Sequence, residues 1–240
     1  MVLEQDSPFF LLATDFPIDL TKSSSTVSAV TRGDITRARV LQATLKLMWL
    51  RGYGSVTIDG ICEQAEIQKG SFYHFFRSKA DVAAAALEAY WATIQPEMER
   101  IFSEPDVWPI QRIVNFFDSV YDRQLQRSKE GGQVMGCPLV TLGAEVIKHD
   151  SLVSAKAREL MDRYCLYFEH ALEEAQTSGE IPFSDASMKA RELYAFLVGS
   201  LVQARMRNDL GILQRLSAGV RANLGLDDKM TKKLAEGQVP

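Results

Sequence analysis

The sequence has few of the residues from which disulfide and metal sites are built. It contains 3 cysteines and 3 histidines in 240 residues. The cysteines, at 62, 137 and 165, are odd in number and widely spaced, which is not the pattern of a disulfide framework and favours a reducing compartment. The histidines, at 74, 149 and 170, stand at no metal-ligand spacing from them. We therefore expect no metal, no cofactor and a cytoplasmic location.

Long hydrophobic runs are also lacking. No stretch reaches about 18 apolar residues, so no membrane-spanning helix is predicted. The start, "MVLEQDSPFFLLATDFPIDL", has a short apolar patch with acidic flanks and no basic segment, which is unlike a signal peptide. A membrane-surface protein anchored by this arm is one alternative, and the acidic flanks argue against it. The composition, 46% hydrophobic and 24% charged, is that of a globular protein.

The net charge of −4 is unevenly distributed. Residues 31–80 hold eight Lys or Arg against four acidic residues, a net charge of +4. Residues 1–30 and 81–240 carry net charges of −3 and −5. A basic segment in an otherwise acidic chain favours, by itself only weakly, a surface that binds a polyanion such as nucleic acid.

From Asp34 onward, apolar residues recur at helical spacing, and no segment alternates as a strand does. Thr57 and Ser78 are suitable N-caps, and Gly52 with Gly54 ends the first helix. The predicted helices are 34–51, 57–65, 68–76, 78–102, 108–127, 138–148, 151–177, 185–207 and 210–224. The pattern predicts an all-α protein with a small N-terminal helical unit and a larger helical bundle.

The stretch "QKGSFYHFF", residues 68–76, combines a basic residue, a glycine and polar aromatic rings at the start of a short helix. Three short helices with a tight turn between the second and third form a helix-turn-helix unit, whose second helix enters the major groove by its N-terminal end. Gly70 would let that helix approach DNA closely, and Tyr73 and His74 would reach phosphates. A stripe that only packs a core would explain the phenylalanines but not Gly70, Tyr73 and His74 together.

Residues 39–82 resemble the TetR/AcrR family of transcriptional regulators. The matches stand at the spacing of the family's pattern: Gly52, Tyr53, Thr57, Ile61, Ala65, Gly70, Phe72, Tyr73, Phe76, Ser78 and Lys79. The resemblance implies a ligand-responsive DNA-binding regulator, most often a repressor, that binds a double-stranded operator as a homodimer. It also implies that the DNA-binding residues are Thr57, Gln68, Lys69, Gly70, Ser71, Tyr73, His74 and Lys79.

Three positions depart from the family pattern. The usual turn glycine is Glu66, which would be strained by about 1 kcal/mol if its φ angle is positive. The usual serine is Gln68, a poorer N-cap but a possible reader of adenine. Cys62 replaces an alanine and is interpreted as a small core residue. These changes affect operator identity and affinity rather than the fold.

Residues 1–33 have no helical period and include a Ser/Thr-rich linker, which predicts a flexible N-terminal arm. With the resemblance, the rest of the chain divides into a helix-turn-helix DNA-binding domain (34–82), a helical effector-binding and dimerisation domain (83–226) and a C-terminal tail (227–240). Residues 196–224 resemble the paired helices through which the family dimerises, with Leu197, Leu201, Ile212, Leu213 and Leu216 as apolar positions; packing inside the monomer is the alternative. The candidate effector-binding residues are Trp91, Met98, Phe117, Tyr121, Cys137, Tyr164 and Phe168, for which plain core is the alternative.

Cys137 follows a glycine and precedes Pro138 in "GCPLVTLGAE". This segment resembles one through which some family members sense electrophiles, and a helix N-terminus favours a reactive thiolate. A small buried thiol is the alternative role within a regulator. An enzyme with Cys137 as its nucleophile is the competing function; no histidine lies nearby in the sequence to serve as its base.

Overall fold

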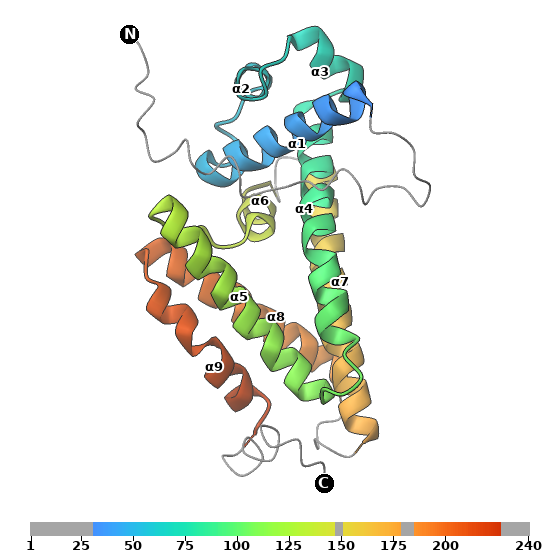
Figure 1. Ribbon diagram of the computed structural model, residues 1–240, viewed down its shortest axis with the longest axis vertical. Helices are drawn as coiled ribbons and strands as arrows, with labels where there is room; N and C mark the ends of the chain where they lie inside the picture. The colour runs from blue at the N-terminus through green and yellow to red at the C-terminus, as the bar shows by residue number, and fades with distance from the viewer. Residues whose placement is uncertain (1–30, 147–150, 179–184, 227–240) are drawn as a thin grey trace. The chain divides into compact units, whose positions relative to one another are not determined.

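The computed structural model describes residues 31–146, 151–178 and 185–226, and all the regular secondary structure within these ranges is helical (Figure 1). The elements are α1 (Arg32–Arg51), α2 (Ile58–Gln64), α3 (Lys69–Phe75), α4 (Lys79–Phe102), α5 (Pro109–Gly131), α6 (Pro138–Val146), α7 (Ser151–Thr177), α8 (Ala186–Arg207), the 3₁₀ helix η2 (Leu210–Arg215) and α9 (Leu216–Asn223). The all-α prediction is therefore confirmed. The predicted tail and nearly all of the predicted arm lie outside the described residues. Within the described ranges, no helix is both long and apolar enough to cross a membrane.

The described residues form two compact units. One contains 31–95 and 138–161, and the other contains 96–137 and 162–226. Helices α4 and α7 each contribute residues to both units, and α6 belongs to the unit of the helix-turn-helix. The predicted domain boundary at residue 82 stays a prediction, since the first unit extends beyond it.

Helix α1 begins at Arg32, two residues before the predicted start, because Thr31 caps it. The Thr31 hydroxyl oxygen accepts from the Asp34 N–H at 3.2 Å, and the Asp34 carboxylate accepts from the Thr31 N–H at 2.9 Å. This reciprocal pair satisfies two amides that a helix end leaves unbonded. The helix packs against α2, with Leu45, Met48 and Trp49 almost fully buried.

An aromatic core organises the second unit. Phe102, Phe116 and Phe168 meet with ring centroids 5.3 to 6.1 Å apart. Phe117 stacks on Phe168 at 5.9 Å and on Phe196 of α8 at 6.1 Å. Aromatic rings bury more apolar area than other side chains, so these contacts bring α4, α5, α7 and α8 together.

Two further elements differ from the prediction. Helix α5 continues to Gly131 rather than stopping at 127, and ends because Gly132 adopts φ +70° and donates its N–H to the Ser128 carbonyl. The predicted helix 210–224 is two elements, η2 and α9. The Asp209 carboxylate accepts from the Gly211 N–H at 2.8 Å and caps the first of them.

Candidate nucleic-acid interface

Thr57 and Gln68, both named in the sequence analysis, occupy the N-cap positions of α2 and α3, but only one of them caps its helix with its side chain. The Thr57 hydroxyl oxygen accepts from the Gly60 N–H at 3.1 Å and caps α2. Gln68 occupies the N-cap position of α3 but makes no capping bond with its side chain. The Gln68 side chain is exposed, and its predicted role as a reader of adenine stays a prediction.

The turn between α2 and α3 is built on Glu66 in a left-handed conformation, φ +52°. A residue with a Cβ is strained there by about 1 kcal/mol, as the sequence suggested. Arg39 of α1 supports the turn: its guanidinium donates to the Ala65 carbonyl at 2.5 Å and pairs with the Glu66 carboxylate at 3.2 Å. Arg39 was not among the residues singled out in the sequence, because 26 residues separate it from Ala65.

One side of α3 is core and the other is open. Phe72 is fully buried and Phe76, which follows α3, is 3% exposed. The polar residues that precede and line the helix are all exposed: Gln68, Lys69, Gly70, Ser71, Tyr73 and His74. A Cβ added to Gly70 would meet no atom within 4 Å, so the space beside this glycine is open. The predicted contact residues of this segment therefore share one face.

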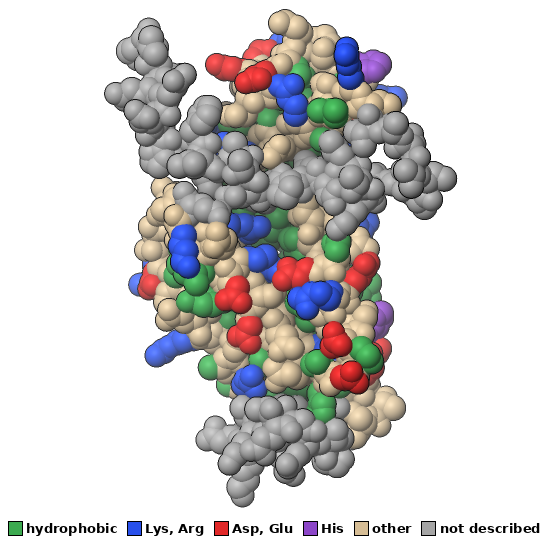
Figure 2. Space-filling model, viewed as in Figure 1, with side chains coloured by type: hydrophobic (Ala, Val, Ile, Leu, Met, Phe, Trp, Pro, Cys, Tyr) green, Lys and Arg blue, Asp and Glu red, His purple; other side chains and the backbone are tan. Residues whose placement is uncertain are grey.

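Acidic side chains accompany the basic ones on this surface (Figure 2). The Lys69 ammonium lies 2.7 Å from the Asp59 carboxylate of α2. Its hydrogen bond to that carboxylate raises the pKa of the Lys69 ammonium above its ordinary value. The cation at the start of α3 is thus already paired within the protein.

Lys79 contacts the turn between α1 and α2. Its ammonium donates to the carbonyl oxygens of Tyr53 at 3.1 Å and Val56 at 3.0 Å, and it lies 4.4 Å from the centre of the Tyr53 ring. An ammonium has three N–H groups, and these carbonyls use two of them. Lys79 therefore has a structural contact in addition to its predicted role at DNA.

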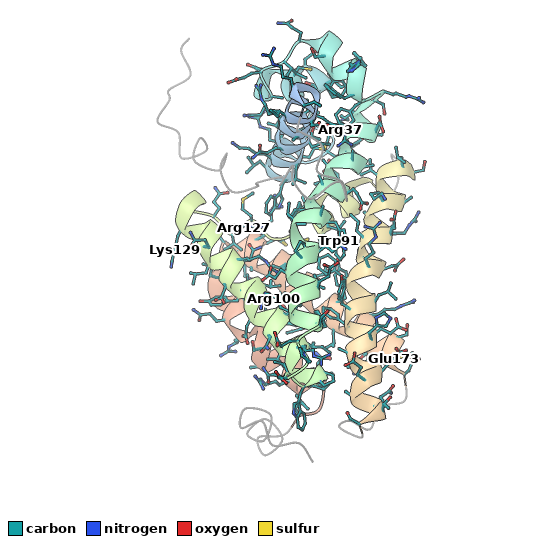
Figure 3. All side chains as sticks on the ribbon, turned by 45° about the vertical axis from the view of Figure 1, so that its right-hand side comes forward. Arg37, Trp91, Arg100, Arg127, Lys129 and Glu173 are labelled. Carbon is teal, nitrogen blue, oxygen red and sulfur yellow. The ribbon has the colours of Figure 1, made fainter. Side chains whose placement is uncertain are left out.

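The candidate effector-binding residues are mostly core. Met98, Phe117 and Phe168 are fully buried, and Tyr164 is 6% exposed. The structure stacks Phe117 on Phe168, whereas the Tyr164 ring lies tilted against that of Tyr194 of α8, with centroids 5.6 Å apart. The half-buried Tyr121 hydroxyl accepts from the Gln214 amide at 3.2 Å. These five residues belong to one unit, and Trp91 of α4 (Figure 3), 3% exposed, belongs to the other.

The loop that precedes Cys137 is held by two side chains that the sequence analysis missed. The buried Gln124 amide donates to the Gly136 carbonyl at 2.8 Å and accepts from the Gly136 N–H at 3.2 Å. The Asn208 side-chain oxygen accepts from the Val134 N–H at 2.8 Å. Asn208 closes α8 in a left-handed conformation, φ +51°, which asparagine adopts more readily than most residues. Cys137 itself is half-buried.

Sequence comparisons cover the two predicted domains separately. Residues 40–86 match the model of "Bacterial regulatory proteins, tetR family", and residues 109–220 match that of "Tetracyclin repressor-like, C-terminal domain". The HTH-type transcriptional repressor NemR of Escherichia coli K12 is 27% identical over 191 residues, 78% of this chain and 92% of that protein. The transcriptional regulator AcuR of Cereibacter sphaeroides is 27% identical over 168 residues, 70% of this chain and 75% of that protein.

Solved structures agree with these matches. The crystal structure of the reduced form of E. coli NemR superposes with a TM-score of 0.69 at 26% identity, covering 78% of this chain and 96% of that one. A regulatory protein TetR from Rhodobacter sphaeroides, 23% identical, gives a TM-score of 0.70 over 79% of this chain and 98% of that one, and shows the same fold. The relatives named here are regulators, so the alternative of a thiol-dependent enzyme gains no support.

Proposed function

The chain belongs to the TetR family of DNA-binding transcriptional regulators, and on that premise we propose that it is a cytoplasmic repressor that leaves its operator when a small effector binds. The exposed polar face of α3 carries this proposal. Phe72 fixes the helix to its neighbours from one side, while Gln68, Lys69 and Ser71 remain exposed on the other. A helix anchored in this way presents its N-terminal end to the major groove.

The exposed residues divide by their chemistry into base readers and phosphate contacts. We assign base reading to Gln68, Lys69, Gly70 and Ser71, and phosphate binding to Thr57, Tyr73, His74 and Lys79. A glutamine amide pairs with adenine through two hydrogen bonds, whereas a contact to phosphate carries no sequence information. The third N–H of the Lys79 ammonium is the group that would reach a phosphate oxygen.

Selection from a random DNA pool, followed by binding titrations at several salt concentrations, tests these assignments. Tyr73→Ala and Lys79→Ala should weaken binding to all sequences alike, and Gln68→Ala should change which bases are selected. A lost cationic contact also reduces the salt slope by about one unit. An unchanged slope and affinity for Lys79→Ala would mean that the lysine serves only the turn between α1 and α2.

We propose that the functional form is a homodimer with half-sites in successive major grooves, about 34–36 Å apart or a multiple of that. Four of the five apolar positions that the sequence suggested for the interface are buried within the protomer and are core instead: Leu197, Leu201, Leu213 and Leu216. The fifth, Ile212, is half-buried. The exposed face of α8 carries a different apolar row. Met188, Val202 and Met206 are 60%, 38% and 81% exposed, and Ala195 and Gly199 lie between them at helical spacing. This row is the surface that we assign to the partner protomer.

The effector that we propose is a small apolar or electrophilic molecule acting on the second domain, residues 83–226. A relative whose structure is named as a reduced form supports a redox- or electrophile-sensitive trigger. With a quinone, the Cys137 sulfur would bond to a ring carbon as the C=C π bond breaks. The thiol gives up its proton, the attacked ring carbon loses its hydrogen as a proton when the ring becomes aromatic, and the two quinone oxygens take up two protons. The product is a hydroquinone thioether, in which the thiol has supplied the electron pair, so no outside reductant is needed.

Treatment with 1,4-benzoquinone tests the trigger. The wild-type protein should leave operator DNA, and Cys137→Ser should stay bound. Cys62→Ser and Cys165→Ser are matched controls and should respond as the wild type does. Release of the Cys137→Ser protein at the same quinone concentration would remove the thiol from the mechanism and leave a non-covalent effector.

A further inference from the structure

The carboxylate of Glu145, at the end of α6, is bound in the turn that joins α1 to α2. It accepts from the Tyr53 N–H at 2.6 Å and from the Gly54 N–H at 2.7 Å. Helix α6 packs on α1 within the same unit (Figure 1). Hydrogen bonds from amides to a charged acceptor are stronger than bonds between neutral groups. Glu145 is therefore a specific link between α6 and the DNA-binding helices.

The two glycines of the turn leave room for this carboxylate. A Cβ on Gly52 would stand 2.7 Å from one Glu145 oxygen, and a Cβ on Gly54 would stand 3.2 Å from the other. Gly52 also adopts φ +80°, a conformation that residues with a Cβ rarely take. The segment Gly52-Tyr53-Gly54 thus provides two converging N–H groups and the space in front of them.

The same turn is held from its carbonyl side by Lys79, the first residue of α4. An anion from α6 and a cation from α4 therefore bind the backbone of one segment, residues 53–56. This segment leads directly into Thr57, the N-cap of α2. A change at either side chain acts on the start of α2 and through it on the turn that precedes α3.

Helix α6 also connects this link to the candidate trigger along the chain. Cys137 immediately precedes Pro138, the first residue of α6, and Glu145 follows eight residues later. At 1.5 Å per residue the helix rises about 10 Å from Pro138 to Glu145. A short helix transmits a displacement of one end to the other, so an event at Cys137 has a direct route to Glu145.

Resting on the proposed function, we propose that Glu145 is a positioning residue: its carboxylate holds the turn between α1 and α2 in the operator-binding form and leaves that turn in the released form. These hydrogen bonds order the segment that starts α2. A helix-turn-helix that is already ordered binds its DNA site more tightly than one that must become ordered on binding. An effector that binds more tightly to the form in which the carboxylate has left the turn then weakens DNA binding. The loss of affinity is set by the difference between the effector's binding free energies for the two forms.

The first test needs no effector. Glu145→Gln replaces one acceptor oxygen by an NH₂ group that cannot accept from an amide, and it should weaken binding to a selected operator at least fivefold. Glu104→Gln, at an exposed glutamate in the other unit, is the matched control and should stay within about twofold of wild type. Amide hydrogen exchange of residues 52–57 should be faster in Glu145→Gln than in the wild type or in Glu104→Gln. Unchanged affinity or unchanged exchange would overturn the proposal.

Gly54→Ala changes the turn rather than the carboxylate. It provides a second test of the same contact in case Glu145→Gln does not fold. It should weaken operator binding because its Cβ would stand 3.2 Å from a Glu145 oxygen, so that the carboxylate must shift by a few tenths of an ångström from its place at the two N–H groups. In the Glu145→Gln background it should add little, since the carboxylate is already lost, and such non-additivity is the signature of one shared contact. Effects that simply add would show that Glu145 and Gly54 act independently and would count against the link.

A last measurement separates positioning from mere support of the fold. The measured quantity is the operator affinity without 1,4-benzoquinone divided by the affinity with it. Typical coupling free energies between two binding sites correspond to a ratio of about 5 to 150, which we expect for the wild type. The ratio should fall towards one in Glu145→Gln and stay at the wild-type value in Glu104→Gln. A wild-type ratio in Glu145→Gln overturns the proposal and leaves the proposed function intact. If the wild type itself ignores the quinone, the electrophile trigger fails, and the affinity and exchange results alone decide the role of Glu145.

Discussion

The Asp59 carboxylate lies 2.7 Å from the Lys69 ammonium, so the first residue of α3, the helix that we propose to enter the major groove, is ion-paired within the protein. In the complex with DNA that we propose, a phosphate or a base would compete with Asp59 for this cation. We therefore expect the pair to lower the affinity for all DNA while it keeps the lysine in a defined place. This arrangement distinguishes the chain from one that presents a bare lysine at the same position.

Asp59→Asn should strengthen binding to operator and to unrelated DNA alike, by about two- to fivefold for each half-site, since an exposed ion pair is a weak competitor. Binding titrations at several salt concentrations will measure this change. Glu63→Gln removes another exposed carboxylate of α2 and is the control for a general change of charge. An equal gain in Glu63→Gln would assign the effect to net charge rather than to the pair with Lys69.

Glu66 provides a test of backbone strain through two substitutions that both remove the carboxylate. Its φ of +52° favours glycine, so Glu66→Gly should be more stable than Glu66→Ala by about 1 kcal/mol, the reverse of the usual preference for alanine. Urea unfolding of the two variants measures the difference directly. An alanine variant as stable as the glycine variant would show that the turn relaxes to a negative φ.

Phe117 is fully buried and stacked between two rings, so Phe117→Ala should lower the free energy of unfolding by about 3–5 kcal/mol. Any loss of effector response in that variant would be confounded by the loss of stability. Tyr121→Phe is the better probe, because it removes only a hydroxyl that accepts from Gln214 and should cost about 1 kcal/mol or less. Thermal unfolding will rank the two; equal stability would mean that the cavity left at 117 refills.

Cys165 should contribute a pH-dependent part of the stability. Burial, and secondarily the charge of Asp162, raises the pKa of its thiol to about 11, whereas an unfolded cysteine has a pKa of about 8.5. The folded state therefore favours the neutral thiol. This contribution is complete below about pH 8.5 and is lost as the pH rises towards 11, because the unfolded chain then ionises first.

Urea unfolding of wild type and Cys165→Ala between pH 7.5 and 10.5 tests this linkage. The wild type should lose more stability than the variant across that interval. In native protein at pH 8.5, the Cys165 thiol should also react with iodoacetamide on the order of tenfold or more slowly than in urea. Parallel stability profiles for the two proteins would show that the thiol titrates normally.

Met206 is the most exposed apolar residue of the row that we assign to the dimer interface. Met206→Glu should convert the dimer to a monomer, because two carboxylates related by a two-fold axis would meet in an apolar contact. Sedimentation at micromolar concentration measures the change. Leu166→Glu, at an exposed leucine of α7 outside the row, should remain dimeric. A dimeric Met206→Glu protein would place the interface elsewhere.

Local chemistry made much of the fold predictable. Thr57 and Ser78 cap their helices with their own side chains, and Gly52 ends α1, so the end of α1 and the starts of α2 and α4 could be read from neighbouring residues. The division of α3 into a buried side with Phe72 and an exposed polar side was also predictable from the order of its residues. Where the prediction erred, as at the end of α5, one further residue decided the outcome: Gly132, rather than the preceding polar residues, stops that helix.

Contacts between distant segments were not predictable from this one sequence. Arg39 meets Ala65, and Gln214 meets Tyr121, through pairings that no local pattern announces. The leucines of 197–216 show the same limit, since apolar spacing alone does not tell whether a face meets its own core or a partner. Periodicity identifies an apolar face, and only the three-dimensional packing identifies what covers it.

The link between Glu145 and the turn bears on how chimeric regulators should be assembled. The carboxylate and the Gly54 amide that binds it are 91 residues apart in the chain. A graft of residues 34–82 onto another regulator's body would transplant the two N–H groups without the side chain that binds them. Such a hybrid should retain its operator preference and respond poorly to inducer. Transplanting α6 together with residues 34–82, so that Tyr53, Gly54 and Glu145 come from one parent protein, should restore the response.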